Sequence, residues 1–163
     1  MRLTENTKIV MKKGPSTTGG FAAVDNCVNM ANYAKCRVIL AVHCSDAAVV
    51  AGAVTLKQGL TAATCTTALA FAEYWKNEDC EAGDTLTRVA ATTLASAGIQ
   101  NKVAMYIFEI RADMLDTDTF KSENQYVGLT MTDLTTATED VSCLFELYEP
   151  RYARGAANMP TAW

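Results

Sequence analysis

The sequence predicts an all-β fold, a β-sandwich or jelly roll with extended N- and C-terminal arms. Short runs of β-branched and aromatic residues recur along the chain, separated by polar segments that are typical of turns. Helical patterns are weak, because threonine, valine and glycine interrupt the alanine-rich stretches at 47–53 and 62–72 and lower their helix propensity. Many short strands without long helical periods favour two packed sheets.

Two segments carry the clearest strand signals. Residues 36–44 alternate, so that every second side chain from Val38 to Cys44 is expected on one face. Residues 103–110 are apolar on both faces, which predicts a central strand covered on both sides. The other strand candidates are residues 49–57, 64–71, 73–75, 86–91, 126–132 and 141–148, and residues 113–116 are expected to form one short helical turn.

The length of 163 residues suits a single domain. Residues 1–20 are polar and end in Ser-Thr-Thr-Gly-Gly, so they are predicted to be an N-terminal arm. Residues 149–163 contain two prolines and one glycine without periodicity, and they are predicted to be a C-terminal tail. The β-sandwich domain is therefore expected over residues 21–148.

The charge balance argues against nucleic-acid binding. The chain has 14 basic and 18 acidic residues, a net charge of −4, whereas wrapping nucleic acid requires clustered lysine and arginine. No apolar signal core or membrane-spanning run is visible. We expect folding in the cytosol, with no membrane and no nucleic-acid partner.

The six cysteines are expected to be free thiols. None forms a C-x-x-C pair, and several lie in apolar strand-like runs. Buried thiols behave as small hydrophobic side chains, and a cytosolic fold forms under reducing conditions. Closed zinc sites commonly use two short-spaced ligand pairs, which this sequence does not contain.

No catalytic or cofactor-binding motif is recognisable. His43 is the only histidine, and its neighbour Cys44 is expected on the opposite face of the same strand. Asp113, Asp116 and Asp118 lack the glycine turn and closing glutamate of a calcium loop. Phosphate-binding glycine motifs and a nucleophile elbow are also missing from the sequence. We therefore expect a protein that is not an enzyme and that uses no cofactor.

Several short motifs follow one another across residues 21–163. They are Ala53-Val-Thr-Leu-Lys57, Tyr74-Trp-Lys-Asn77, Asp84-Thr-Leu-Thr-Arg-Val89, residues 103–115, residues 126–133, and Glu149-Pro-Arg-Tyr-Ala153 followed by Met159-Pro160. Their order resembles a group of small virion-associated proteins of tailed bacteriophages. The resemblance implies a capsid decoration (cement) protein: a β-sandwich, made in the host cytoplasm and placed on the capsid surface. It further implies the major capsid protein as partner and a homo-oligomer, commonly a trimer.

The two arms supply the expected contact residues. An extended segment loses about 1–2 kcal/mol of conformational entropy per ordered residue, so it must gain partner contacts to become ordered. Tryptophan, tyrosine and arginine contribute most to such contacts. The predicted protein-interface residues are Lys12, Lys13, Pro150, Arg151, Tyr152, Arg154 and Trp163.

Two alternatives remain open. One is another virion component, such as a tail, connector or head protein. The other is a carbohydrate-binding β-sandwich in which Tyr74 and Trp75 stack against a sugar, although aromatic residues at a strand end are more often core or interface anchors.

Overall fold

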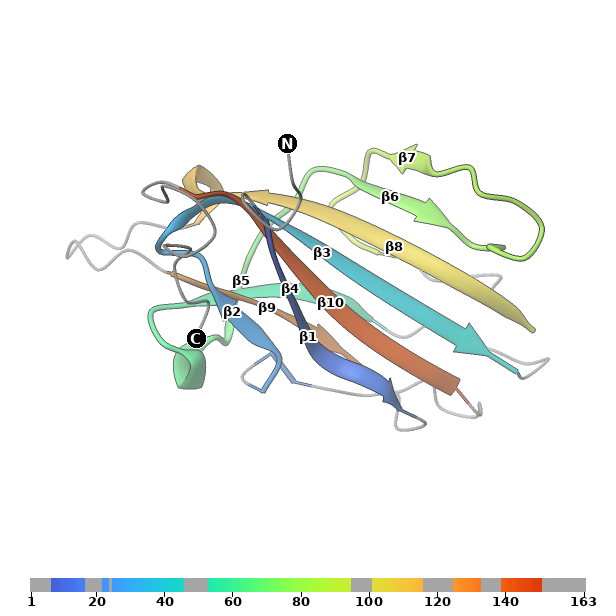
Figure 1. Cartoon of the computed structure of the whole chain (residues 1–163), viewed down its shortest axis with the longest axis horizontal. Helices are drawn as coiled ribbons and strands as arrows, with labels where there is room; N and C mark the ends of the chain where they lie inside the picture. Colours follow the sequence, from blue (N-terminus) through green and yellow to red (C-terminus); the bar gives the residue numbers. More distant parts are fainter. Residues whose placement is uncertain are drawn as a thin grey trace.

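Ten β-strands and two short 3-10 helices make up the described part of the chain. The structure, a computed structural model, describes residues 7–16, 22–23, 25–45, 53–94, 101–115, 125–132 and 139–150. The strands form two antiparallel sheets that lie face to face (Figure 1). The all-β sandwich that the sequence predicts is confirmed.

The large sheet has six strands and the small sheet has four. In spatial order, the large sheet contains β1 (Thr7–Ser16), β10 (Glu139–Pro150), β3 (Tyr33–Cys44), β8 (Lys102–Arg111), β6 (Tyr74–Asn77) and β7 (Thr87–Val89). The small sheet contains β2 (Cys27–Asn29), β9 (Tyr126–Met131), β4 (Val54–Gly59) and β5 (Thr67–Ala68). The two helices are η1 (Ala62–Thr64) and η2 (Ala112–Met114), the second of which matches the short turn expected near residue 113.

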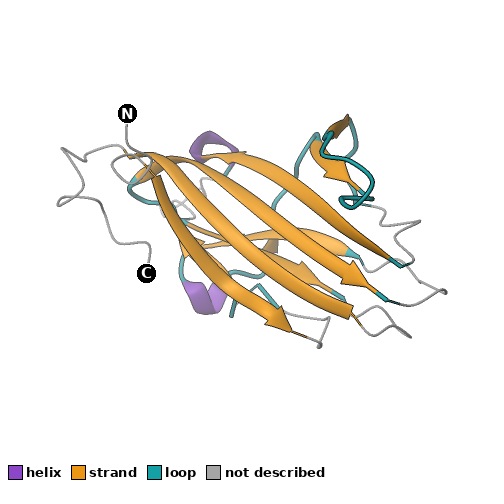
Figure 2. Cartoon of the chain, turned by 45° about the vertical axis from the view of Figure 1, so that its right-hand side comes forward, coloured by secondary structure: helices purple, strands orange, loops and turns teal. Residues whose placement is uncertain are grey.

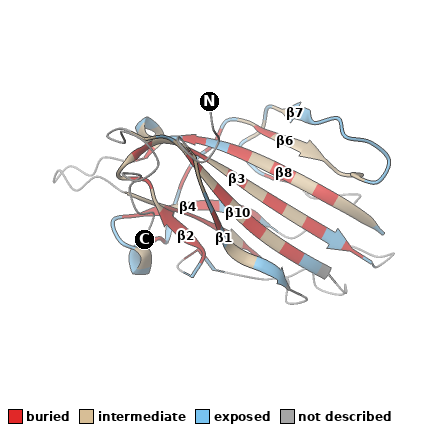
Figure 3. Ribbon diagram, in the orientation of Figure 1, coloured by how far each residue is buried: buried red, intermediate tan, exposed pale blue. Residues whose placement is uncertain are grey.

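Alternation along the central strands gives the large sheet an inner and an outer face. Leu40 of β3 pairs with Cys143 of β10 and with Tyr106 of β8, and all three side chains are fully buried. Every second residue from Val38 to Cys44 is buried, as the sequence predicts. Figure 3 shows the same alternation along all three strands. The inner face packs on the small sheet, and its side chains form one continuous core with those of β4 and β9.

An aromatic cluster fills the core beneath β6 and β8. The Phe108 ring centroid lies 5.2 Å from that of Phe71 and 5.8 Å from that of Tyr74. The buried Tyr106 hydroxyl donates a hydrogen bond to Glu78 Oε1 at 3.3 Å. Burial raises the pKa of Tyr106, so the hydroxyl remains protonated and keeps donating. This cluster anchors the short strand β6 to the rest of the sheet.

The N-terminal arm expected over residues 1–20 is instead partly a strand. Residues Thr7–Ser16 form β1, which pairs with β10 from the Thr7–Tyr148 pair to the Ser16–Val141 pair. Only three consecutive residues of this segment are apolar, so local sequence does not distinguish it from a polar arm. Pairing with β10 supplies the backbone hydrogen bonds that stabilise it. At the other end, Glu149 and Pro150 complete β10, and residues 151–163 lie outside the described residues.

Residues 64–71, predicted as one strand, form mostly other structure. The Thr61 hydroxyl accepts a hydrogen bond from the Thr64 backbone N–H at 3.2 Å, and Thr64 Oγ1 accepts one from the Thr61 N–H at 2.9 Å. These side-chain contacts cap η1 and compete with strand formation. Only Thr67–Ala68 pairs with β4. The neighbouring candidate at 49–57 becomes β4, which begins at Val54, and residues 49–52 lie outside the described residues.

Gly59, at the end of β4, is tightly enclosed by η1. A Cβ atom at this position would lie 2.3 Å from the Thr64 carbonyl oxygen and 2.6 Å from Cys65 Cα, so the backbone would have to move. We expect Gly59→Ala to lower the free energy of unfolding by about 1–3 kcal/mol, measured by urea denaturation. Gly83→Ala is the matched control, because a Cβ there meets nothing within 4 Å. Equal stability of the two variants would contradict this packing.

Candidate interaction surface

A row of apolar side chains crosses the outer face of the large sheet from β1 to β6. Each member is the register partner of the next one along the sheet. Residues directly opposite on antiparallel strands have Cβ atoms about 4.5–5.5 Å apart, so these side chains lie side by side. We call this set the apolar row, and its members are Met11, Leu144, Ile39, Ile107 and Trp75.

The apolar row is accessible to solvent. Met11 is 60% exposed, and the other four members are partly exposed. Figure 2 shows that no described helix or loop crosses the outer face of the large sheet along β10, β3 and β8. Ala41 and Met105, which pair with each other, extend the apolar surface beside the row. Single exposed apolar residues are ordinary, but a contiguous set of them marks an interaction surface.

Ion pairs border the apolar row on one side. Arg37 of β3 lies one outward position from Ile39, and its guanidinium donates to Glu146 at 2.6 Å and to Glu109 at 3.0 Å. The Arg37 guanidinium also lies 5.4 Å from the centre of the Tyr148 ring. These contacts hold the charged side chains in place next to the apolar ones. An apolar centre with a polar border is the usual anatomy of a protein–protein interface.

A polar contact also lies at the opposite end of the same face. His43 Nδ1 is 3.7 Å from Asp140 Oδ2, and both side chains are about half exposed. His43 is exposed while Cys44 is buried, so the sequence-based expectation that the two side chains point to opposite faces is confirmed.

Glu149 and Pro150, the first two residues of the Glu149–Ala153 motif, are the last two residues of β10. Glu149 has a φ of 56°, in the left-handed region that non-glycine residues seldom adopt. Its carboxylate accepts a hydrogen bond from Lys35 Nζ at 2.6 Å, which raises the pKa of Lys35. This ion pair fixes the Glu149 side chain at the charged border of the outer face.

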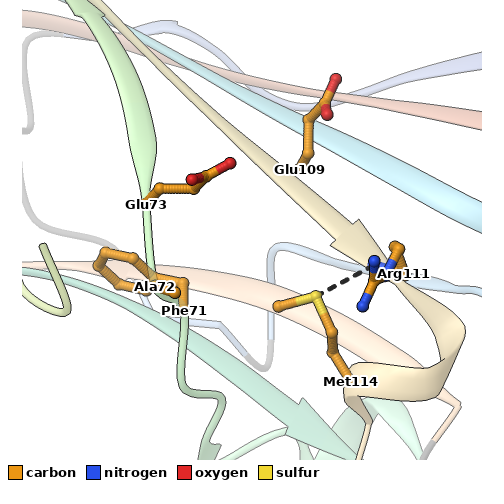
Figure 4. A pocket seen from close by; sticks show the side chains of 6 residues that line it. All are labelled: Phe71, Ala72, Glu73, Glu109, Arg111 and Met114. Atoms are coloured by element: carbon orange, nitrogen blue, oxygen red, sulfur yellow. Dashed lines mark hydrogen bonds between the residues drawn. The ribbon is translucent and has the colours of Figure 1, made fainter. Parts of the chain in front are cut away.

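A pocket of about 320 Å³ lies where β8 ends. The residues that line it are Phe71, Ala72, Glu73, Glu109, Arg111 and Met114 (Figure 4). Its three charged side chains are all engaged in ion pairs: Glu73 with Arg88, Glu109 with Arg37, and Arg111 with Asp113. In the view of Figure 4, Phe71 and Met114 lie below the two glutamates, so the pocket is apolar on one side and acidic on the other. This pocket lies at the border of the outer face, where β8 ends.

A second pocket, of about 370 Å³, lies at the β6–β7 hairpin and is lined by lysine, asparagine, acidic and threonine residues. Lys102 Nζ contacts Asp79 Oδ2 at 3.0 Å, and this hydrogen bond lowers the pKa of Asp79. Lys76 Nζ contacts Glu78 Oε2 at 2.5 Å. Each charged side chain that lines this pocket is therefore paired with another of opposite charge in the same pocket.

The cysteines are free thiols, and five of the six are buried. Burial raises the pKa of Cys143 to about 12 and also raises that of Cys36, so both remain protonated core side chains. Cys27 differs, because a hydrogen bond from Cys65 lowers its pKa to about 7. This pair lies in a small core cluster with Ala23, separate from the apolar row.

Among the described residues, no group of three or more histidine, cysteine, aspartate or glutamate side chains is arranged to hold a metal ion. In the same part of the chain, no helix is both long and apolar enough to cross a membrane.

Comparison with known proteins gives one similar structure. No protein-family model matches the sequence, and no curated protein matches it. The crystal structure of the SPBc2 prophage-derived protein YomS is similar over 89% of this chain and 95% of that chain, with 10% sequence identity and a TM-score of 0.40.

The structure separates the two aromatic residues of the carbohydrate-binding alternative. Tyr74 is 3% exposed and packs in the aromatic core, whereas Trp75 belongs to the outer apolar row. Adjacent strand residues point to opposite faces, so the two rings do not form one sugar-binding platform.

The predicted contact residues do not all lie together. Three of them lie on two strands, at places far apart, and the other four lie outside the described residues. Lys12 and Lys13 lie on β1, and Lys13 pairs with Cys143 of β10. Pro150 lies seven residues further along β10, about 23 Å away at roughly 3.3 Å per residue. Arg151, Tyr152, Arg154 and Trp163 lie outside the described residues and stay predictions.

The apolar row itself was not predicted from the sequence. Its clearest signal is that residues 103–110 are apolar on both faces, a pattern that predicts a strand covered on both sides. In the structure, β8 is covered on its inner face only, as far as the described residues extend, and Ile107 and Met105 remain partly exposed. The second apolar face of β8 is therefore part of the exposed apolar surface of the large sheet.

Proposed function

We propose that this protein is a virion structural protein that binds the outside of a phage capsid and stabilises contacts between capsid subunits. The observation that carries the proposal is the apolar row on an accessible sheet face, bordered by fixed ion pairs. The resemblance of its sequence motifs to small phage virion proteins supports the phage setting.

A structural role of this kind acts by mass action and needs no reacting groups. A protein that binds the assembled shell, and not its free subunits, stabilises the shell by RT ln(1 + [L]/Kd). At a concentration 100 times Kd, this amounts to about 2.7 kcal/mol for each site. The major capsid protein is the proposed partner, with this chain acting as a homo-oligomer.

Co-sedimentation with intact particles tests the proposal. Purified protein is added to particles that lack it and, separately, to unassembled capsid subunits, and each mixture is centrifuged. We expect saturable binding to the particles, with a rise in the temperature at which the shell dissociates, and no binding to free subunits. The protein remaining in the supernatant at every concentration tested would contradict a capsid role.

A further inference from the structure

A second, smaller core lies on the face of the small sheet that points away from the large sheet. Neighbouring strand residues point to opposite faces, and Val28 of β2 belongs to the main core between the sheets. Cys27 therefore points to the other face, where it packs with Ala23 and Cys65 in a separate cluster. Ala62 of η1 packs against this cluster, and η1 lies beside β2 (Figure 1). The small sheet thus carries two buried thiols outside the main core.

Strand β9 brings the two cysteines to the same place. Cys27 is the register partner of Gly128. Cys65 Sγ lies 3.9 Å from the carbonyl oxygen of Tyr126, whose side chain packs against the cluster. Tyr126 and Gly128 are alternate residues of β9 and share one face. The two sulfur atoms are within hydrogen-bonding distance of each other.

Glycines line the places where the cysteine-bearing segments approach the sheet. A Cβ atom at Gly128 would lie 2.8 Å from Ala23 Cβ and 3.1 Å from Cys27 Cβ. A Cβ atom at Gly59 would lie 2.6 Å from Cys65 Cα. Glycine within a strand often marks such a close approach. Glycine at both positions therefore permits the two thiols to meet.

The two thiols differ in acidity. The hydrogen bond from Cys65 is the largest of the causes that lower the pKa of Cys27 to about 7, so about half of Cys27 is thiolate near neutral pH. The same hydrogen bond raises the pKa of Cys65, which stays protonated. The thiolate is the attacking form in thiol–disulfide exchange. Cys27 is therefore suited to attack first, and Cys65 to attack second.

The cover over this pair is thin. Helix η1 is a single turn without a buried residue, and Ala63, Thr64 and Thr66 are exposed. Local opening of this one turn exposes the two thiols to a small reagent. Cys36 and Cys143, by contrast, lie in the main core between the two sheets, where only a larger opening reaches them.

From this arrangement we propose that Cys27 and Cys65 form a reversible disulfide, which ties β2 to the end of η1 across β9. The oxidant is a low-molecular-weight disulfide. The Cys27 thiolate attacks it, forms a mixed disulfide and releases one thiolate; Cys65 then gives up its proton and displaces the second thiolate. Two protein thiols are oxidised to one disulfide, and the reagent is reduced to two thiols that take up the two protons. The inference goes beyond the proposed function and does not rest on it.

The disulfide is expected to stabilise the fold. It closes a loop of about 40 residues, and it fastens β2, a strand of three residues that pairs with β9 alone among the described strands. The melting temperature of the oxidised protein should be about 5–10 °C above that of the reduced protein. Under reducing conditions the pair stays as two thiols, and in an oxidising environment it closes.

Tryptic mapping of the whole chain tests the inference. The protein is equilibrated near neutral pH with mixtures of reduced and oxidised glutathione, blocked with N-ethylmaleimide and digested. Trypsin cleaves after Lys35 and Lys57, so Cys27 and Cys65 lie in different peptides, which mass spectrometry identifies when they are linked. We expect the linked Cys27–Cys65 peptides as the main intramolecular product, with a yield that rises with the share of oxidised glutathione.

Three variants separate the roles of the thiols. Cys65→Ser leaves Cys27 without a second thiol, so a mixed disulfide with glutathione should accumulate at Cys27. Cys27→Ser should give no such adduct at Cys65. In both variants the difference in melting temperature between oxidised and reduced protein should disappear. Cys80→Ser is the matched control, because Cys80 is the one cysteine that is not buried, and this variant should keep the linked peptides and the temperature difference.

The wild-type mapping decides the inference even where a serine variant fails to fold. Linked peptides missing at every glutathione ratio, or a disulfide that joins Cys27 or Cys65 to a different cysteine, would overturn it. An oxidised protein that carries the link but melts at the temperature of the reduced protein would contradict the stabilising role. Binding to phage particles does not enter this experiment, so its outcome leaves the proposed function to be judged by co-sedimentation.

Discussion

Replacing Phe108 by alanine is expected to lower the free energy of unfolding by about 3–5 kcal/mol. Phe108 is 1% exposed and contacts the rings of Phe71 and Tyr74 in the aromatic cluster. Removing the Phe108 ring leaves a cavity in the aromatic cluster. It also removes the contact with Tyr74 that packs the short strand β6 against the core. Urea denaturation monitored by circular dichroism measures the loss.

Ile107→Ala is the matched control for this prediction. Ile107 is the neighbour of Phe108 on β8, but it points to the outer face and is partly exposed. Because less of its surface is removed from water on folding, its replacement should cost clearly less than that of Phe108. Equal losses for the two variants would mean that the inner and outer faces of the large sheet are assigned incorrectly.

Ile39→Glu is expected to reduce the affinity of the protein for phage particles by a factor of about 30 to 1,000, equivalent to a loss of roughly 2–4 kcal/mol. Ile39 lies at the centre of the apolar row, between Leu144 and Ile107. In the free protein the glutamate is solvated on the outer face, so folding is little affected. In the complex its charge is buried without a partner, which is costly. Co-sedimentation with particles measures the affinity.

Two further variants control for non-specific effects. Leu60→Glu introduces the same charge at a leucine that is 44% exposed and directly follows β4 of the small sheet, and it should bind as the wild type does. Ile39→Leu conserves volume and apolarity and should also bind normally. Similar weakening by Ile39→Glu and Leu60→Glu would show that net charge, and not the row, governs attachment.

The long strands were predictable from the sequence because their own residues carry the signal. β3 alternates in a simple pattern from Val38 to Cys44, and β9 and β10 have enough β-branched and aromatic residues to be recognised. The short or terminal strands were not predictable in this way. β1 depends on pairing with the far end of the chain, and β5 is limited to two residues by the threonine-capped turn before it.

The apolar row could not be predicted from the sequence, because its members come together only through the register of the paired strands. Met11, Ile39 and Leu144 are far apart in the sequence, and only the strand pairing places them in one line. Likewise, nothing local connects Cys27 with Cys65, which meet in the core through β2 and the residue after η1. The available signal was an apolar pattern on both faces of one strand, and this pattern does not distinguish a covered face from an exposed apolar face.

Hydroxyl-radical footprinting of the particle-bound protein tests the central claim most directly. Oxidation rates of individual side chains are compared by mass spectrometry for the free protein and for protein bound to intact capsids. The account predicts strong protection of Met11, Trp75 and Leu144 on binding, and unchanged oxidation of Leu60, which is exposed next to β4 of the small sheet. Unchanged oxidation along the apolar row, with protection at Leu60 instead, would contradict it.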